Sequence, residues 1–176
     1  MELYLSVTKK QKQFMDAPES EVLFGGAAGG GKSFGQVTDA LLFALRYKGS
    51  RQLILRRSFT ELDKSLIRYA LAIYPRAIYT FNSSSHTGRF KNGSTIDFGY
   101  CATENDVYQY QSAEYDVIRF DEAYSECSEI RRDYLIDTAL AKKHDPSFVK
   151  FLLTTEFGMG EDTDGDNEIK ITVEVI

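Results

Sequence analysis

The stretch from residue 21 to residue 33, Glu-Val-Leu-Phe-Gly-Gly-Ala-Ala-Gly-Gly-Gly-Lys-Ser, decides the fold of this chain. The apolar run before the glycines predicts a buried parallel strand. The residues after the run of glycines predict an amphipathic helix, with Val37, Leu41, Ala44 and Leu45 on one face. Between strand and helix, the pattern GxxxxGK[ST] is matched at every required position by Gly26, Ala27, Ala28, Gly29, Gly30, Gly31, Lys32 and Ser33.

This pattern indicates a loop that binds phosphate groups. Glycines let the backbone turn tightly and direct successive N–H groups at phosphate oxygens, and the helix N-terminus adds its positive dipole. We expect Lys32 to reach the β- and γ-phosphates of ATP, and the Ser33 hydroxyl to hold Mg²⁺. The alternative, a glycine-rich linker or an ordinary strand–helix turn, is disfavoured because the motif follows a strand and opens an amphipathic helix.

A second candidate group is the pair Asp121-Glu122, which ends the apolar strand predicted over residues 115–120. A carboxylate in that position lies at the C-terminal edge of the sheet, where open α/β folds bind their ligands. We expect Asp121 to bind the Mg²⁺ through its water shell and Glu122 to act as the general base that polarises the attacking water. The alternative is a helix-capping pair.

The rest of the chain predicts strands that alternate with helices, and hence a mostly parallel sheet flanked by helices. Helices are predicted over residues 8–15, with Thr8 as N-cap, from the capping box at 58–61 to Pro75, and over 126–141. Further strands are predicted over 52–56 and 148–154. Asn92-Gly93, between alternating residues, predicts a β-hairpin over 89–98 as an insertion.

Composition limits the classes of protein that this chain can represent. Its 176 residues, 43% hydrophobic and 27% charged, suit one globular domain. No apolar run is long enough for a membrane span, so we expect no membrane contact. Two cysteines without CxxC spacing suit reduced thiols in an intracellular protein.

The net charge of −5 is unevenly distributed along the chain. Residues 156–176 hold seven acids and one base, so the rest is near neutral and a nucleic-acid partner is not excluded. Five bases with no acid among them lie between Asp39 and Glu61, and they predict a positive surface for DNA phosphates. Solvated bases at a helix end are the alternative. The five are Arg46, Lys48, Arg51, Arg56 and Arg57.

Two further polar positions are candidates for nucleotide contacts. Gln11 lies upstream of the glycine-rich loop, and an amide there can read the adenine edge; a solvated helix position is the alternative. Thr154 and Thr155 end the last predicted strand, beside the expected phosphates, where their hydroxyls can sense the γ-phosphate. A simple strand-end turn is the alternative there.

Taken together, these features resemble the ATPase domain of the large terminase, the DNA-packaging motor of tailed bacteriophages. The resemblance covers residues 8 to about 155, and an ordered set of motifs carries it. These are Thr-Lys-Lys-Gln (8–11), the loop region (23–33), Leu-Ile-Leu-Arg-Arg-Ser (53–58), Asn-Gly-Ser-Thr-Ile-Asp-Phe-Gly-Tyr (92–100), Glu-Asn-Asp-Val-Tyr (104–108) and Ala-Glu-Tyr-Asp-Val-Ile-Arg-Phe-Asp-Glu (113–122).

The resemblance implies a role for each matching residue. Gln11 is the adenine-binding glutamine, Lys32 and Ser33 belong to Walker A, Asp121 is the Walker B aspartate and Glu122 the catalytic glutamate. Thr154-Thr155 is similar to the coupling motif of the family. The implied fold is a RecA-like P-loop NTPase of the additional-strand, catalytic-glutamate type, with the extra strand between the P-loop and Walker B strands.

The resemblance also implies partners and a domain division. The partners are double-stranded DNA, a portal protein, a small terminase subunit and further copies of the chain in a ring, in the cytoplasm of a bacterial host. We expect an ATPase domain over residues 1–155 and an acidic tail over 156–176.

The chain departs from the family pattern in three ways. No nuclease activity is expected, because 21 residues after Thr155 cannot hold the nuclease domain of the family. Glu156-Phe157 replaces the Asn-Pro that commonly follows the coupling motif. The arginine finger is unassigned, with Arg56, Arg57, Arg131 and Arg132 as candidates. Two alternatives therefore stay open: a fragment of another RecA-like DNA motor such as a helicase, and a remnant that binds nucleotide or partners without hydrolysis.

Overall fold

The structure, a computed structural model, describes residues 2–25, 31–121, 150–155 and 168–174. For residues 150–155 it describes the backbone alone. The helix predicted over 126–141 lies outside the described residues. Within them, no helix combines the length and the apolar character that a membrane crossing requires.

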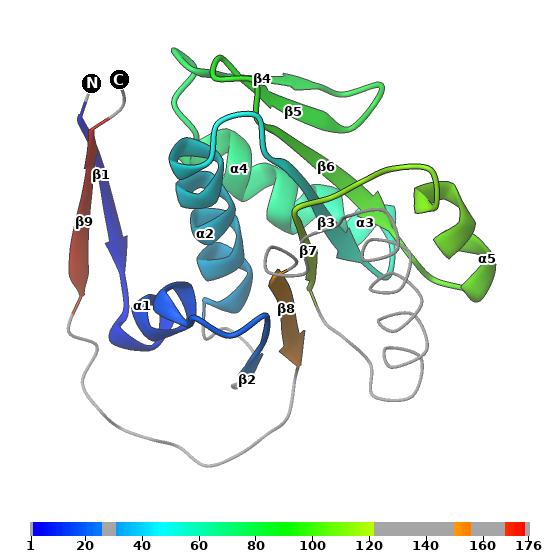
Figure 1. The fold of residues 1–176 in the computed structure, drawn as a ribbon, viewed down its shortest axis with the longest axis horizontal. Coiled ribbons are helices and arrows are strands. Elements are labelled where there is room, and N and C mark those ends of the chain that lie inside the picture. The colour runs from blue at the N-terminus through cyan, green and yellow to red at the C-terminus, as the bar shows by residue number, and fades with distance from the viewer. Residues whose placement is uncertain (1, 26–30, 122–149, 156–167, 175–176) are drawn as a thin grey trace.

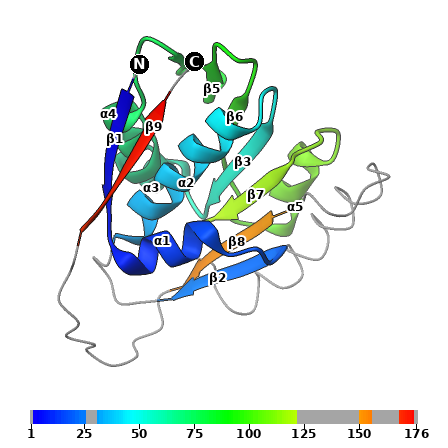
Figure 2. The ribbon, with the colours of Figure 1, turned by 60° about the vertical axis from the view of Figure 1, so that its left-hand side comes forward.

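The centre of the molecule is a mixed sheet of seven described strands in the order β2-β8-β7-β3-β6-β5-β4. The first five in this order run parallel, and β5 and β4 pair antiparallel at the far edge. Figure 2 shows β8 between β2 and β7. The strands are β2 (Glu21–Gly25), β3 (Arg51–Arg56), β4 (Tyr79–Asn82), β5 (Thr87–Phe90), β6 (Thr95–Tyr100), β7 (Val117–Phe120) and β8 (Lys150–Thr155).

Helices cover both faces of this sheet (Figure 1). Alternate residues of β3 point to opposite faces. Ile54 therefore packs with residues of α2 and α4, whereas Leu53 and Leu55 pack with residues of α5 and the strand β7. The helices are α1 (Lys9–Asp16), α2 (Lys32–Arg46), α3 (Phe59–Leu62), α4 (Arg68–Ile73) and α5 (Glu104–Val107), with a 3₁₀ turn at Tyr108–Tyr110.

The predicted helix after residue 58 forms, but it is not a uniform α-helix. A π-helical turn, Asp63–Ile67, joins α3 to α4. Leu62, Leu66 and Ala70 are fully buried, as the spacing predicts, and Ile73 is partly buried. Ser58 accepts a hydrogen bond from the Glu61 N–H at 3.3 Å, but the Glu61 carboxylate lies near Arg56, so only half of the expected capping box is present.

Two strand predictions need correction. Residues 21–25 form the predicted parallel strand, but β2 is the edge strand of the described sheet and Leu23 is 60% exposed rather than buried. The hairpin around Asn92-Gly93 also forms, with Gly93 at a φ of 89°. It is an extension of the main sheet rather than an insertion, because β6 pairs parallel with β3.

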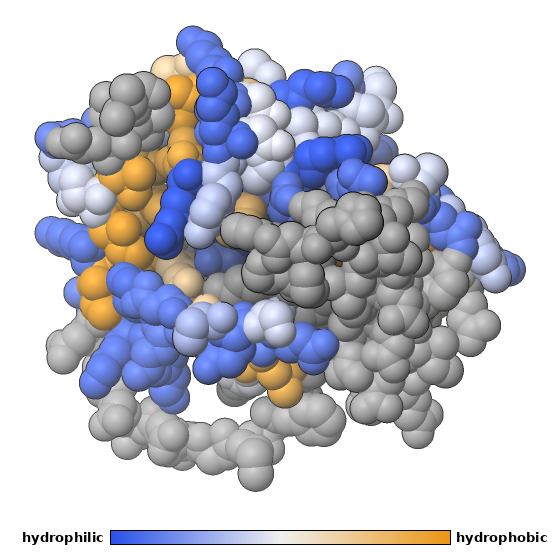
Figure 3. Space-filling model, viewed as in Figure 1, coloured by the Kyte–Doolittle hydropathy of each residue, from blue (hydrophilic) through white to orange (hydrophobic). Residues whose placement is uncertain are grey.

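A two-stranded antiparallel ribbon, which sequence reasoning missed, joins the ends of the chain. It consists of β1 (Glu2–Val7) and β9 (Ile169–Glu174), with Leu5 opposite Ile171. Leu5 is buried against α2 and Ile171 packs partly there, while Tyr4 and Thr172 face outward. Figure 1 places both termini at one end of this ribbon, and Figure 3 shows hydrophobic surface gathered along that side.

The ribbon bears on the expected division at residue 155. Residues 169–174, expected within an acidic tail, form a strand that returns to the first residues of the chain. The division into a domain over 1–155 and a tail over 156–176 stays a prediction.

Candidate active site

Ser33 and Asp121 meet at the C-terminal edge of the parallel sheet. The Ser33 hydroxyl lies 3.0 Å from both carboxylate oxygens of Asp121 and donates to them. Ser33 is the second residue of α2, and Asp121 directly follows β7, where its backbone N–H donates to Leu55 O at 2.8 Å. Asp121 is 2% exposed. Two residues 88 positions apart are thus brought together, as their motifs predict.

The start of α2 supplies the conditions for binding an anion. Gly31 is the N-cap, at a φ of 69°, and Lys32 is the first helical residue and 8% exposed. The backbone N–H groups of the first turn and the dipole of this 15-residue helix favour negative charge at this end. A side chain at Gly31 would be strained by the positive φ, and its Cβ would lie 2.7 Å from Gln11 Nε2.

The Gln11 amide contacts the backbone on both sides. Its Oε1 accepts from Thr8 N at 2.8 Å, which completes the capping box of α1, and its Nε2 donates to Gly31 O at 2.8 Å. Gln11 is 3% exposed. The structure therefore places Gln11 against the end of the loop motif, with both amide groups bonded to the protein backbone, and its adenine-reading role stays a prediction.

A row of buried polar contacts, which sequence reasoning missed, joins α2 to β7. Gln36 Nε2 donates to Phe120 O at 2.7 Å, and Arg119 Nη2 donates to Asp39 Oδ2 at 2.8 Å. Arg119 Nη1 also donates to Gln52 Oε1 at 2.6 Å, and Arg119 is fully buried. Together with Ser33 these contacts align the helix that carries the loop motif with the strand that carries Asp121. Ser33, Gln36 and Asp39 recur every third residue, which marks one polar face of the helix but does not identify its partners on β7.

Arg56 is a second basic residue, besides Lys32, that the structure places at this site. Its Nη1 lies 3.2 Å from Asp121 Oδ2, and its side chain is only 12% exposed. It ends β3, the strand beside β7. Of the candidate arginine fingers, Arg57 is exposed, and Arg131 and Arg132 lie outside the described residues.

The five bases between Asp39 and Glu61 do not form one surface, because Arg51 and Arg56 lie at opposite ends of β3, and their contact with DNA stays a prediction. Arg51 begins β3 and Arg56 ends it, a separation of about 17 Å. Arg46 ends α2, at the end remote from Ser33, and stacks over the Tyr47 ring at 5.5 Å.

The remaining predicted site residues are only partly described. Thr154 lies on β8 opposite Phe24 of β2, and Thr155 lies opposite Gly25, so both are at the strand ends that face the loop motif. Residues 26–30 and Glu122 lie outside the described residues.

The Ser33–Asp121 pair fits a magnesium ion by the chemistry of its donors. Mg²⁺ prefers oxygen ligands, keeps several waters and is held in nucleotide sites by one or two protein oxygens. A hydroxyl and a carboxylate in contact beside a helix N-terminus provide such oxygens. Among the described residues, no group of three or more His, Cys, Asp or Glu side chains offers a metal site of another kind.

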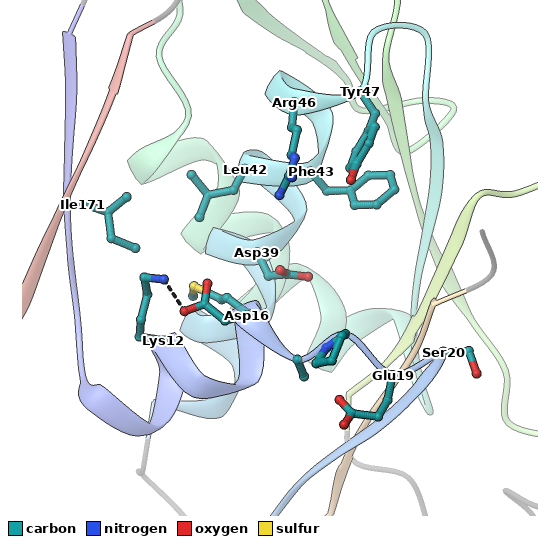
Figure 4. A pocket seen from close by; sticks show the side chains of 13 residues that line it. Lys12, Asp16, Glu19, Ser20, Asp39, Leu42, Phe43, Arg46, Tyr47 and Ile171 are labelled. Carbon is teal, nitrogen blue, oxygen red and sulfur yellow. Dashed lines mark hydrogen bonds and ion pairs between the residues drawn. The ribbon is translucent and has the colours of Figure 1, made fainter. Parts of the chain in front are cut away.

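A cavity of about 550 Å³ lies at the other end of α2 (Figure 4). The second half of α2 forms one wall, and the end of α1 with the loop that follows forms another. Lys12 and Asp16 form an ion pair across one turn of α1 at its edge. Its lining on α2 begins at Asp39, six residues and about 9 Å along the helix from Ser33.

Comparison with solved structures identifies the fold. The large terminase of a thermophilic bacteriophage superposes with a TM-score of 0.61 at 15% identity, over 84% of this chain and 38% of that chain. The same protein in complex with ATP-γ-S superposes with a TM-score of 0.59 at 14% identity, over 84% of this chain and 37% of that chain. The bacteriophage HK97 large terminase superposes with a TM-score of 0.59 at 12% identity, over 85% of this chain and 33% of that chain.

These likenesses show the fold, a RecA-like P-loop α/β fold of the kind found in large terminases. At these identities they show the fold alone. The chain spans less than two-fifths of the length of these three structures. No protein-family model matches the chain, and no curated protein sequence matches it.

Proposed function

We propose that this chain is the ATP-binding and ATP-hydrolysing motor domain of a phage large terminase, which drives packaging of viral DNA. The observation that carries the proposal is the 3.0 Å contact between Ser33 Oγ and the Asp121 carboxylate. A hydroxyl from the phosphate loop and a carboxylate from a neighbouring strand end are the protein groups that hold Mg²⁺ in P-loop NTPases. The fold likeness to large terminases supports the same assignment.

The start of α2 is the proposed site for the nucleotide phosphates. Lys32 supplies positive charge to the β- and γ-phosphates, and the loop 26–31 supplies backbone N–H groups. Ser33 and Asp121 hold Mg²⁺, which when bound offsets the negative charge that develops on the phosphates. Gln11 reads the adenine edge after giving up its bonds to Thr8 and Gly31, and Thr154 lies beside the γ-phosphate.

Glu122 is the proposed general base. It follows Asp121, and its carboxylate accepts a hydrogen bond from the attacking water and orients that water onto the γ-phosphorus. The position of β8 between β2 and β7 supports assignment to the additional-strand, catalytic-glutamate class of this fold.

The proposed setting is the packaging machine in the cytoplasm of a bacterial host. There the domain acts on double-stranded DNA, with a portal protein, a small terminase subunit and further copies of itself in a ring. The likeness to two phage large terminases supports these partners.

Mg²⁺-dependent ATP hydrolysis by the purified chain tests the proposal. We expect slow turnover in the wild type, loss of about 100-fold or more in Glu122→Gln with nucleotide binding retained, and no change in Glu114→Gln. Glu114 is the matched control, because it is an exposed acid upstream of β7. Binding without hydrolysis in the wild type would favour the remnant alternative instead. Hydrolysis that is unchanged in Glu122→Gln would overturn the assigned base.

A further inference from the structure

Asp121 has a cation beside it in this structure, and that cation is Arg56. The pair joins Arg56 Nη1 to Asp121 Oδ2 at 3.2 Å, with side-chain exposures of 12% and 1%. A carboxylate removed from water to this degree is costly unless a positive charge or hydrogen bonds compensate it. Ser33 donates a hydrogen bond to Asp121, and Arg56 places a positive charge beside it.

Arg56 also contacts the start of the 59–73 helix. Its Nη1 donates to Ser65 Oγ at 2.5 Å, and its Nε lies 3.9 Å from Glu61 Oε2. Ser65 lies in the π-helical turn and donates back to Glu61 O at 2.7 Å. One guanidinium thus links Asp121 to α3 and to the π-helical turn. Single π-helical turns inside α-helices occur frequently at functional sites.

A metal ion at Ser33 and Asp121 changes the charge balance around Arg56. The carboxylate that now attracts the guanidinium would be shared with a divalent cation, and two cations at one poorly exposed carboxylate repel each other. Glu61 offers the guanidinium a second carboxylate, since it already lies 3.9 Å from Nε and its side chain is half exposed.

We propose that Arg56 is a counter-ion of Asp121, and that a divalent cation bound at Asp121 moves the Arg56 guanidinium toward Glu61. The segment 59–67 then takes up a different set of contacts when the metal is bound. Arg56 is thus a positioning residue, because its contacts with the segment 59–67 change when Asp121 binds a metal ion. The inference deepens the proposed function and rests on it for the identity of the metal-bound nucleotide.

Titration with Mg²⁺ alone, followed by the thermal unfolding midpoint, tests the counter-ion role. Arg56→Gln should unfold at a lower temperature without metal, and Mg²⁺ should restore it with a half-saturating concentration about tenfold below that of the wild type. Adding Asp121→Asn to Arg56→Gln should abolish this restoration. Arg68→Gln, at an exposed arginine of α4 with the same loss of charge, should behave like the wild type. Equal Mg²⁺ dependence in Arg56→Gln and the wild type would overturn the proposal.

Hydrogen exchange of the backbone amides of residues 59–67 tests the link to the helix. With Mg²⁺ and ATP-γ-S, exchange in the wild type should change by about threefold or more, whereas Arg56→Gln should show no metal-dependent change. Arg56→Lys keeps the charge but not the planar fork, so it should keep the wild-type Mg²⁺ titration and lose the exchange response. An exchange response in Arg56→Gln equal to that of the wild type contradicts the link.

The two tests separate this inference from the proposed function. If ATP-γ-S binds no variant but Mg²⁺ alone still discriminates Arg56→Gln from the wild type, the nucleotide assignment fails and the counter-ion role stands. If all variants bind ATP-γ-S and this binding depends on Mg²⁺ to the same extent in each, the nucleotide assignment stands and the counter-ion role fails.

Discussion

Arg119 shows how a single side chain orders the site. It is fully buried on β7, two residues before Asp121, and its guanidinium bonds Asp39 of α2 and Gln52 of β3. A buried guanidinium is tolerated because both of these acceptors are in place. Residues on one strand face alternate by two, so Arg119 and Asp121 both face α2. The Arg119–Asp39 pair and the Asp121–Ser33 contact therefore join the same helix to the same end of β7.

Asp39→Asn should destabilise the protein by about 3 to 5 kcal/mol, because it leaves a buried arginine without a counter-charge. The free energy of unfolding in urea measures this directly. Asp16→Asn is the matched control, since Asp16 is an exposed acid paired with Lys12, and its loss should cost less than about 1 kcal/mol. Equal small losses in the two variants would show that Arg119 does not depend on Asp39.

The Gly31 position combines backbone strain with a close contact. Gly31→Ala should weaken nucleotide binding and lower stability by about 2 kcal/mol or more, because φ is positive and the added Cβ would lie 2.7 Å from Gln11 Nε2. Gly49→Ala is matched in backbone, at a φ of 77°, but nothing lies within 4 Å of its Cβ. It should cost about 1 kcal/mol. Chemical unfolding compares the two variants. Equal losses in the free energy of unfolding would show that the contact with Gln11 does not contribute to the effect of Gly31→Ala.

At the scale of elements, local sequence patterns predicted most of what forms. Thr8 caps α1, the amphipathic spacing after Lys32 forms α2, the apolar run 52–56 lies within β3, and Asn92-Gly93 makes its turn. Each of these local structures depends on residues only a few positions apart in the sequence. The π-helical turn at 63–67 was not predictable, because its side chains have ordinary helical spacing.

The candidate site divides in the same way. Ser33 and Asp121 were predictable as partners because each belongs to a motif with a known chemical role. The contacts of Gln36, Asp39 and Arg119 were not, because they join residues about 80 positions apart and no motif specifies them. The ion pair of Arg56 with Asp121 was missed for the same reason: an arginine at a strand end has many possible partners in sequence alone.

At the scale of the whole molecule, the β1–β9 ribbon joins the two ends of the chain against α2. Its strands lie more than 160 residues apart, and no turn signal connects them, so its pairing follows from tertiary packing alone. The inward residues, among them Leu5 and Ile171, add to the core that also contains Val37 and Leu41 of α2. The ribbon therefore supports the helix that begins at the candidate site.

Ile171→Asp should lower the free energy of unfolding by about 2 kcal/mol or more, because it places a charge on the packed face of the ribbon. Thr172→Asp, the next residue on the outward and exposed face, should change stability by less than about 0.5 kcal/mol. Denaturant unfolding of the two variants separates the faces. If both variants match the wild type, the ribbon does not contribute to the stability of the domain.

The central claim is that the start of α2 and the Ser33–Asp121 pair form a magnesium-dependent nucleotide site. Equilibrium binding of a fluorescent ATP analogue, with Mg²⁺ and with EDTA, tests it most directly. We predict binding that Mg²⁺ strengthens, a loss of at least about tenfold in Lys32→Ala, and no change in the exposed control Lys48→Ala. Binding that is absent from the wild type, or equal in Lys32→Ala and Lys48→Ala, would contradict the account.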